Sequence, residues 1–173
     1  MKGYKKMIKR IRQFYINLID KMYPQDYDYV KSKLNEREYN LFEKLSKSEQ
    51  KHCVRVAREI EHLFEVKDIK EDLIRDNKEI LIKASLLHDV GKTKSRINII
   101  EKSIIVILSK ITKQRLKNLK NDKVQCYYNH AEYSYELLKN ISSNEILDIV
   151  RYHHSNNVTD PLLLFFQQID DNN

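Results

Sequence analysis

Glycine and proline are almost absent from this chain, and their scarcity limits the folds open to it. Its 173 residues include two glycines, Gly3 and Gly91, and two prolines, Pro24 and Pro161. Hairpins and strand-rich folds need many tight turns, which usually take Gly, Pro or Asn where the backbone geometry is special. Leu, Ile, Lys and Glu, which favour helices or tolerate them well, are abundant instead. The sequence therefore predicts an all-α protein, of a length usual for one domain.

The N-terminal part reads as a helical extension. From Tyr4 to Met22 apolar residues recur at helical spacing, with several Lys and Arg in the first turns. This pattern predicts an amphipathic helix, either docked on the protein body or held against a membrane surface or nucleic acid. Pro24 and the following QDYDY predict a connector. We therefore expect an extension over residues 1–33 and a main domain over residues 34–173.

Helix-start signals recur along the main domain. Ser46 with Glu49 forms a capping-box pattern before an apolar face that continues to about Glu65. Asp76 with Glu79 predicts a second start, and Gly91 in a left-handed conformation would end that helix. Further helices are expected over residues 98–111, 131–140 and 144–154 and from residue 160 onward.

The stretch ASLLHDVGK places His88 and Asp89 in the last turn of a predicted helix. Consecutive helical side chains are about 100° apart, so both can reach one ion only near a helix end, where the backbone relaxes. Gly91 supplies that end. Lys92 would then lie beside the ion, as a cation for a phosphate oxygen.

The chain has six histidines, and the order of five of them is informative. His52 lies on an early helix, the HD pair follows, His130 opens NHAEYSYELL, and His153 and His154 stand in RYHHSNN. His62 is left out, because ten residues turn a helix by about 280° beyond full turns and direct it away from His52.

This order, with an aspartate in LLFFQQIDDNN, resembles the HD-domain superfamily of metal-dependent phosphohydrolases from about Asn35 to the end of the chain. The resemblance implies an all-helical HD bundle whose core metal ligands are His52, His88, Asp89 and Asp170. Asp170 matches the family aspartate better than Asp171, because it directly follows the apolar LLLFFQQI.

The later histidines match those of HD proteins that hold two metals. The resemblance implies that His130 binds a second ion together with His153, His154 or both, and that Asp89 bridges the two ions. The expected cofactors are thus two divalent cations, such as Fe, Mn or Mg. Asp89, Lys92 and His130 would be the catalytic residues, with a metal-activated hydroxide as the nucleophile.

The expected reaction is hydrolysis of a phosphoester or phosphoanhydride bond in a nucleotide-like substrate, for which a dinucleoside polyphosphate is one candidate. The alternative is a ligand-sensing or scaffolding module without catalysis. The formal charge of +7 suits an anionic partner, and we expect a small nucleotide-like molecule rather than a nucleic acid.

No apolar run approaches the roughly 18 residues of a membrane span, and no signal-peptide pattern begins the chain. We therefore expect a cytoplasmic protein in which Cys53 and Cys126 are ordinary reduced thiols. The oligomeric state does not follow from the sequence.

Overall fold

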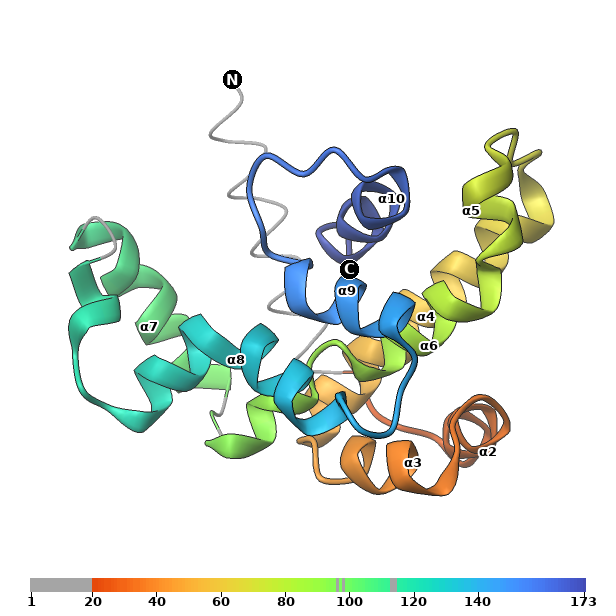
Figure 1. The fold of residues 1–173 in the computed structure, drawn as a ribbon. Helices are drawn as coiled ribbons and strands as arrows, with labels where there is room; N and C mark the ends of the chain where they lie inside the picture. The colour runs from red at the N-terminus through yellow and green to blue at the C-terminus, as the bar shows by residue number, and fades with distance from the viewer. Residues whose placement is uncertain (1–19, 96, 98, 113–114) are drawn as a thin grey trace.

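The computed structural model describes residues 20–95, 97, 99–112 and 115–173, which form helices joined by short connections (Figure 1). The described residues contain no β-strand, so the predicted all-α class is confirmed. In chain order the elements are α2 (Pro24–Lys33), α3 (Glu36–Phe42), α4 (Lys47–Val66), α5 (Asp72–Asp76), α6 (Lys78–Leu87), the 3-10 turn η1 (Val90–Lys94), α7 (Ile99–Ile111), the 3-10 turn η2 (Arg115–Asn118), α8 (Asp122–Leu138), α9 (Asn144–Tyr152) and α10 (Pro161–Asp170).

The centre of the fold is the pair α4 and α6, which pack along each other. α4 is amphipathic and buries Val54, Ala57 and Ile60, which recur at helical spacing on one face. α6 is apolar around most of its circumference, and α3, α9 and α10 also contact it. Because α6 is enclosed in this way, the residues that follow its last turn enter the protein interior.

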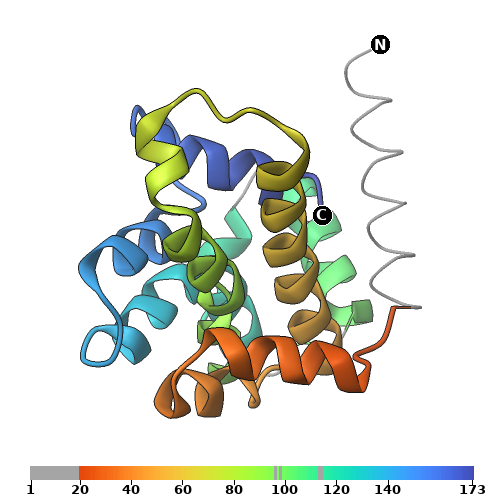
Figure 2. The ribbon, with the colours of Figure 1, turned by 90° about the vertical axis from the view of Figure 1, so that its right-hand side faces the viewer.

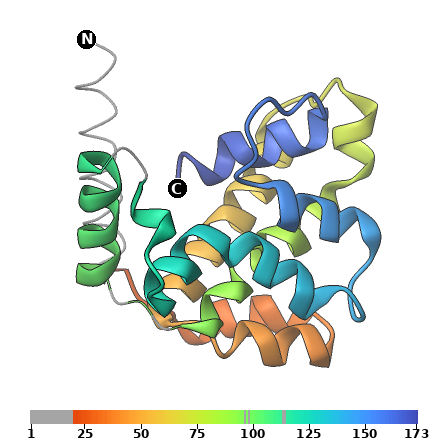
Figure 3. The same ribbon diagram turned by 60° about the vertical axis from the view of Figure 1, so that its left-hand side comes forward.

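The other helices surround this pair. α2 and α3 lie at one end of it and α10 lies at the other (Figures 1 and 2). α8 packs on η1 and α9, while α7 stands at one side of the molecule beside α8 and η2 (Figure 3). The C-terminal end of α6, the middle of α8, the end of α9 and the end of α10 therefore converge near the first turns of α4.

Several helix boundaries differ from the predictions. Pro24 begins α2 instead of marking a connector, because the first helical turn needs no N–H from that residue. α6 begins at Lys78, and Asp76 ends the separate short helix α5. α8 begins at Asp122 and not at residue 131, since the Asn121 side chain accepts two N–H groups of its first turn.

Most of the predicted N-terminal helix lies outside the described residues. Residues 20–23 are not helical, so that helix does not extend to Met22. Val30 of α2 is fully buried in the main core. The division into residues 1–33 and 34–173 stays a prediction. Among the described residues, no helix combines the length and the apolar character needed to cross a bilayer.

Candidate metal centre

The helix that leads to the HD pair ends slightly earlier than the predicted end at Gly91. α6 ends at Leu87, His88 keeps helical angles, and Asp89 leaves them with φ −99° and ψ 1°. Both residues are 1% exposed. The relaxed backbone at Asp89 thus lets two consecutive side chains face one buried space.

Gly91 does not end the helix as predicted, because no glycine of the described residues has a positive φ. Its role is steric. A Cβ on Gly91 would lie 2.1 Å from the backbone oxygen of His130 and 2.5 Å from the backbone nitrogen of Ser134. The missing side chain allows η1 to touch the backbone of α8, which brings His130 next to the His88–Asp89 turn.

Ser134 joins α8 to this turn by two hydrogen bonds. Its hydroxyl accepts the Gly91 N–H at 2.7 Å and donates to the His88 carbonyl, also at 2.7 Å. Ser134 is fully buried. The serine therefore satisfies two backbone groups at the helix end and fixes α8 against it.

One group of side chains comes from α4, the end of α6 and the end of α10. His52 Nε2 lies 3.0 Å from Asp170 Oδ1, and His88 Nε2 lies 3.5 Å from the same oxygen. Asp89 Oδ2 lies 3.4 Å from His88 Nε2 and 4.0 Å from His52 Nε2. The ligand atoms of His52, His88 and Asp170 all lie within 4.8 Å of one another, as metal ligands must.

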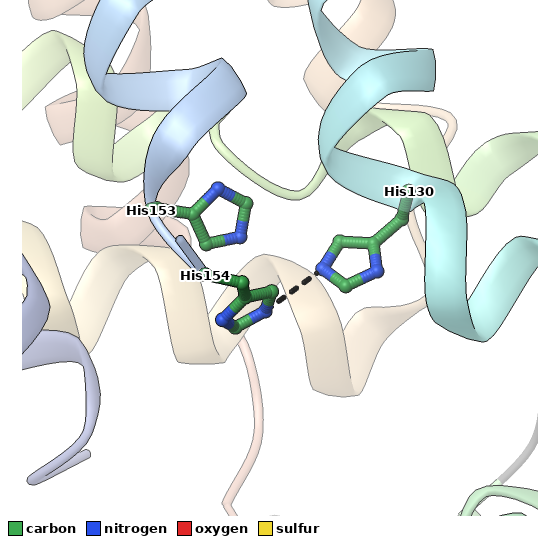
Figure 4. A group of neighbouring side chains, drawn as sticks. All are labelled: His130, His153 and His154. Atoms are coloured by element: carbon green, nitrogen blue, oxygen red, sulfur yellow. Dashed lines mark hydrogen bonds between the residues drawn. The ribbon is translucent and has the colours of Figure 1, made fainter. Parts of the chain in front are cut away.

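A second group comes from α8 and the residues after α9. His130, His153 and His154 point toward one another (Figure 4), and their ligand atoms also lie within 4.8 Å of one another. His130 Nε2 is 3.1 Å from His154 Nε2 and 3.4 Å from Asp89 Oδ1. Asp89 thus directs one oxygen to each group of histidines.

Three of these histidines are oriented in the same way. In each of them Nδ1 donates to the carbonyl oxygen three residues earlier, so that Nε2 faces the centre. The distances are 2.8 Å from His88 to Ser85, 2.9 Å from His130 to Tyr127 and 2.6 Å from His153 to Val150.

The charges of the centre are set by its burial and by the close aspartates. Burial lowers the pKa of His130 to about 3, so that this ring is neutral at pH 7. Burial also opposes a charge on His88, but Asp89 and Asp170 raise the pKa of that ring well above its usual value. Burial likewise opposes charge on Asp170, yet His88 and His52 hold its pKa well below the usual range.

Two buried atoms of the centre have no hydrogen-bond partner among the residues that the structure describes. They are Nε2 of His153 and Oδ1 of Asp89. Unpaired polar atoms are costly to bury, and these two face the histidine groups. Both atoms are lone-pair donors of the kind that bind divalent transition metals, so the residues present fit such ions.

Lys92 lies beside the metal candidates. Its ammonium group contacts Asp89 Oδ2 and lies 2.9 Å from Glu49 Oε2. Burial disfavours the charge on Lys92, but the two carboxylates raise its pKa well above the usual value. Burial opposes the charge on Glu49, but Lys102 and Lys92 outweigh this effect and lower the pKa of Glu49 to about 2.

The structure brings together all the residues that the sequence predicted for the site. His62 is exposed and lies apart from them, as expected. Sequence reasoning missed Glu49 and Ser134. Glu49 lies one helical turn before His52, and Ser134 one turn after His130, so a search of the same helix faces could have found both.

Sequence reasoning also missed the position of Cys53, whose sulfur lies near the ligand atoms of His88 and Asp89. Burial raises the pKa of this thiol and favours its neutral form. Cys53 and Cys126 are both free, as predicted.

Comparison with known proteins gives one result. The family model described as HD domain matches residues 50–171, which is most of the chain and contains every predicted metal ligand. No curated protein and no solved structure matches.

Proposed function

This chain belongs to the HD domain family, whose members are generally metal-dependent phosphohydrolases, and we infer that it hydrolyses a phosphoester or phosphoanhydride bond in a nucleotide-like substrate. The observation that carries this inference is the convergence of five histidines and two aspartates from distant helices. Burying so many ionisable side chains together is costly for a folded chain, and bound metal ions would offset that cost.

We assign the first ion to His52, His88 and Asp170, and the second to His130, His153 and His154. Asp89 would bridge them, since its Oδ2 faces the first group and its Oδ1 the second. We include both His153 and His154, because the ligand atoms of both lie close to that of His130. Five imidazoles against two carboxylates favour a transition metal such as Fe or Mn over Mg, which prefers oxygen ligands.

Divalent ions bound there would lower the pKa of water toward about 7 and neutralise charge on a phosphoryl group. The protein's own groups supply orientation and further charge. Lys92 is a partly buried cation next to Asp89 and can bind a phosphate oxygen as charge develops. His130 keeps its proton on Nδ1 through the Tyr127 carbonyl and so presents a lone pair to the centre at neutral pH.

A nucleotide-like substrate, with a dinucleoside polyphosphate as one candidate, is supported by the family and by the net charge of +7. The cytoplasmic location stays a prediction. The alternative function, a module that binds a ligand without catalysis, keeps the fold and the metals but predicts no turnover.

Hydrolysis of bis(p-nitrophenyl) phosphate and of a nucleotide panel, in Mn or Fe, separates the two functions. We expect the wild-type protein to release p-nitrophenol and Asp89→Ala to lose at least about a hundredfold in rate. His62→Ala is the matched control, because it removes an imidazole from α4 outside the site. Equal rates in Asp89→Ala and wild type would contradict the assignment, and no turnover in any metal would favour the binding module.

A further inference from the structure

From the metal centre a series of ion pairs with alternating charge leads toward the protein surface. Lys92 contacts Asp89 on its inner side and Glu49 on its outer side, where Nζ lies 2.9 Å from Oε2. The other oxygen of Glu49 lies 3.0 Å from Nζ of Lys102 in α7. The Glu49 carboxylate thus joins two ammonium groups, one from η1 and one from α7.

The side chains of this series are buried at the inner end and most exposed at the outer end. Asp89 is 2% exposed, Glu49 and Lys92 are 12% and 17% exposed, and Lys102 is 36% exposed. Lys102 therefore stands at the outer end, where solvent and a ligand can reach it.

The outer end adjoins a small cleft, with about 20 Å³ of enclosed space, that has both cationic and apolar walls. Glu49, Lys92 and Lys102 line it together with Leu45, Ile97 and Tyr127. The ammonium groups at the edge of this cleft can pair with a phosphate group that approaches from the solvent side at Lys102.

The Glu49 carboxylate bridges two ammonium groups, which is an arrangement that suits an anionic ligand. It is an anion with two oxygens, each on a different lysine, as a bound phosphate would be. Divalent ions at the metal centre would offset the charge of Asp89, which then compensates Lys92 less. The cleft would therefore carry excess positive charge and favour a further anion.

We propose that Lys92, Glu49 and Lys102 form a gated anion subsite, which takes a second phosphate group of the substrate next to the one that is cleaved. This inference rests on the proposed function. Glu49 holds the two lysines until the second phosphate replaces its carboxylate. The substrate class is thus a nucleoside phosphoanhydride, with at least two linked phosphates, rather than a simple phosphomonoester.

Calorimetric binding of two nucleotides to the Mn-loaded protein tests the subsite without turnover. The probes are AMP, with one phosphate, and α,β-methylene-ADP, whose second phosphate cannot be cleaved from the first by hydrolysis. We expect the wild-type protein to prefer the diphosphate by about tenfold or more, because a charge-assisted contact contributes that much. Lys102→Met should reduce this preference to about threefold or less.

Lys123→Met is the matched control. The Lys123 ammonium pairs with Glu101 of α7, is 44% exposed and lies outside the cleft lining, so its loss changes the net charge equally. The control should keep the wild-type preference. Glu49→Gln should strengthen binding of the diphosphate several-fold, since the competing charge is removed. Circular dichroism verifies that each variant is folded.

The proposed subsite is overturned if Lys102→Met keeps the wild-type preference, if Lys123→Met loses it equally, or if Glu49→Gln weakens diphosphate binding. It is also overturned if the wild-type protein does not distinguish the two nucleotides. Failure of the proposed function looks different. A protein that selects the diphosphate through Lys102 but hydrolyses no phosphoester or phosphoanhydride in Mn or Fe supports the subsite and contradicts the catalytic role.

Discussion

Replacing Gly91 by alanine tests the contact that positions the two halves of the centre. An alanine Cβ would lie 2.1 Å from the His130 carbonyl oxygen, against 3.4 Å for the shortest ordinary contact. This oxygen and the Ser134 nitrogen, at 2.5 Å, are both backbone atoms of α8, so rotation of a side chain cannot relieve the contact. The helix must withdraw by about 1.3 Å, which is the difference between 3.4 Å and 2.1 Å.

The magnitude of the expected destabilisation follows from this withdrawal. Overpacking of a closely packed site costs typically about 1–3 kcal/mol. Loosening the two buried hydrogen bonds of Ser134 adds about 1–3 kcal/mol for each group left unpaired. The higher helix propensity of alanine returns at most about 1 kcal/mol. We therefore expect Gly91→Ala to lower the free energy of unfolding by about 2 kcal/mol or more.

Urea denaturation followed by circular dichroism measures this change. Lys94→Ala, an exposed substitution in the same 3-10 turn, is the control and should change stability by about 0.5 kcal/mol or less. Because α8 carries His130, Gly91→Ala should also weaken binding of the second metal ion. A Gly91→Ala protein as stable as wild type, or more stable, would refute the steric argument.

Three further predictions follow from other contacts. Ser134→Ala leaves two buried backbone groups unpaired and should lower the free energy of unfolding by about 2–4 kcal/mol in urea; a loss below about 0.5 kcal/mol would contradict that role. Burial opposes the charge of Asp26, but the hydrogen bond and charge of Lys51 hold its pKa below the ordinary 3.8, so the carboxylate stabilises the fold above that pH and the benefit disappears as the pH falls further. Urea titrations of Asp26→Asn should therefore show a deficit at pH 7 that shrinks toward pH 2, and a deficit that does not vary with pH would disprove the ion pair's role. His154→Ala should bind one Mn ion fewer than wild type by elemental analysis, whereas His62→Ala should match wild type, and an unchanged ion count in His154→Ala would remove that residue from the ligands.

Much of the fold class and of the candidate site follows from the sequence, because helical periodicity and residue order are local properties. Scarce glycine and proline predict helices, and the HD pair at a helix end predicts two side chains that face one space. The periodicity does not tell which helices touch. That Gly91 serves a close approach to α8, and that Ser134 caps a different helix, depends on the packing of segments far apart in the chain.

The dependence on packing between distant segments also explains why Glu49 was not recognised as part of the site. Its place in a capping-box pattern is visible in the sequence, and its backbone N–H does bond the Ser46 side chain. Its contacts with Lys92 and Lys102 join three elements and arise only when α7 and η1 meet α4. A local pattern therefore gave Glu49 a role at the helix start, while the fold gives its carboxylate a second one.

The central claim, a two-ion centre bridged by Asp89, is tested most directly by anomalous scattering from crystals of the Mn-loaded protein. The account predicts two Mn peaks, one among His52, His88 and Asp170 and one among the three remaining ligand histidines, with an Asp89 oxygen on each. Peaks at other places on the chain, or none at the site in crystals grown at saturating Mn, would contradict it.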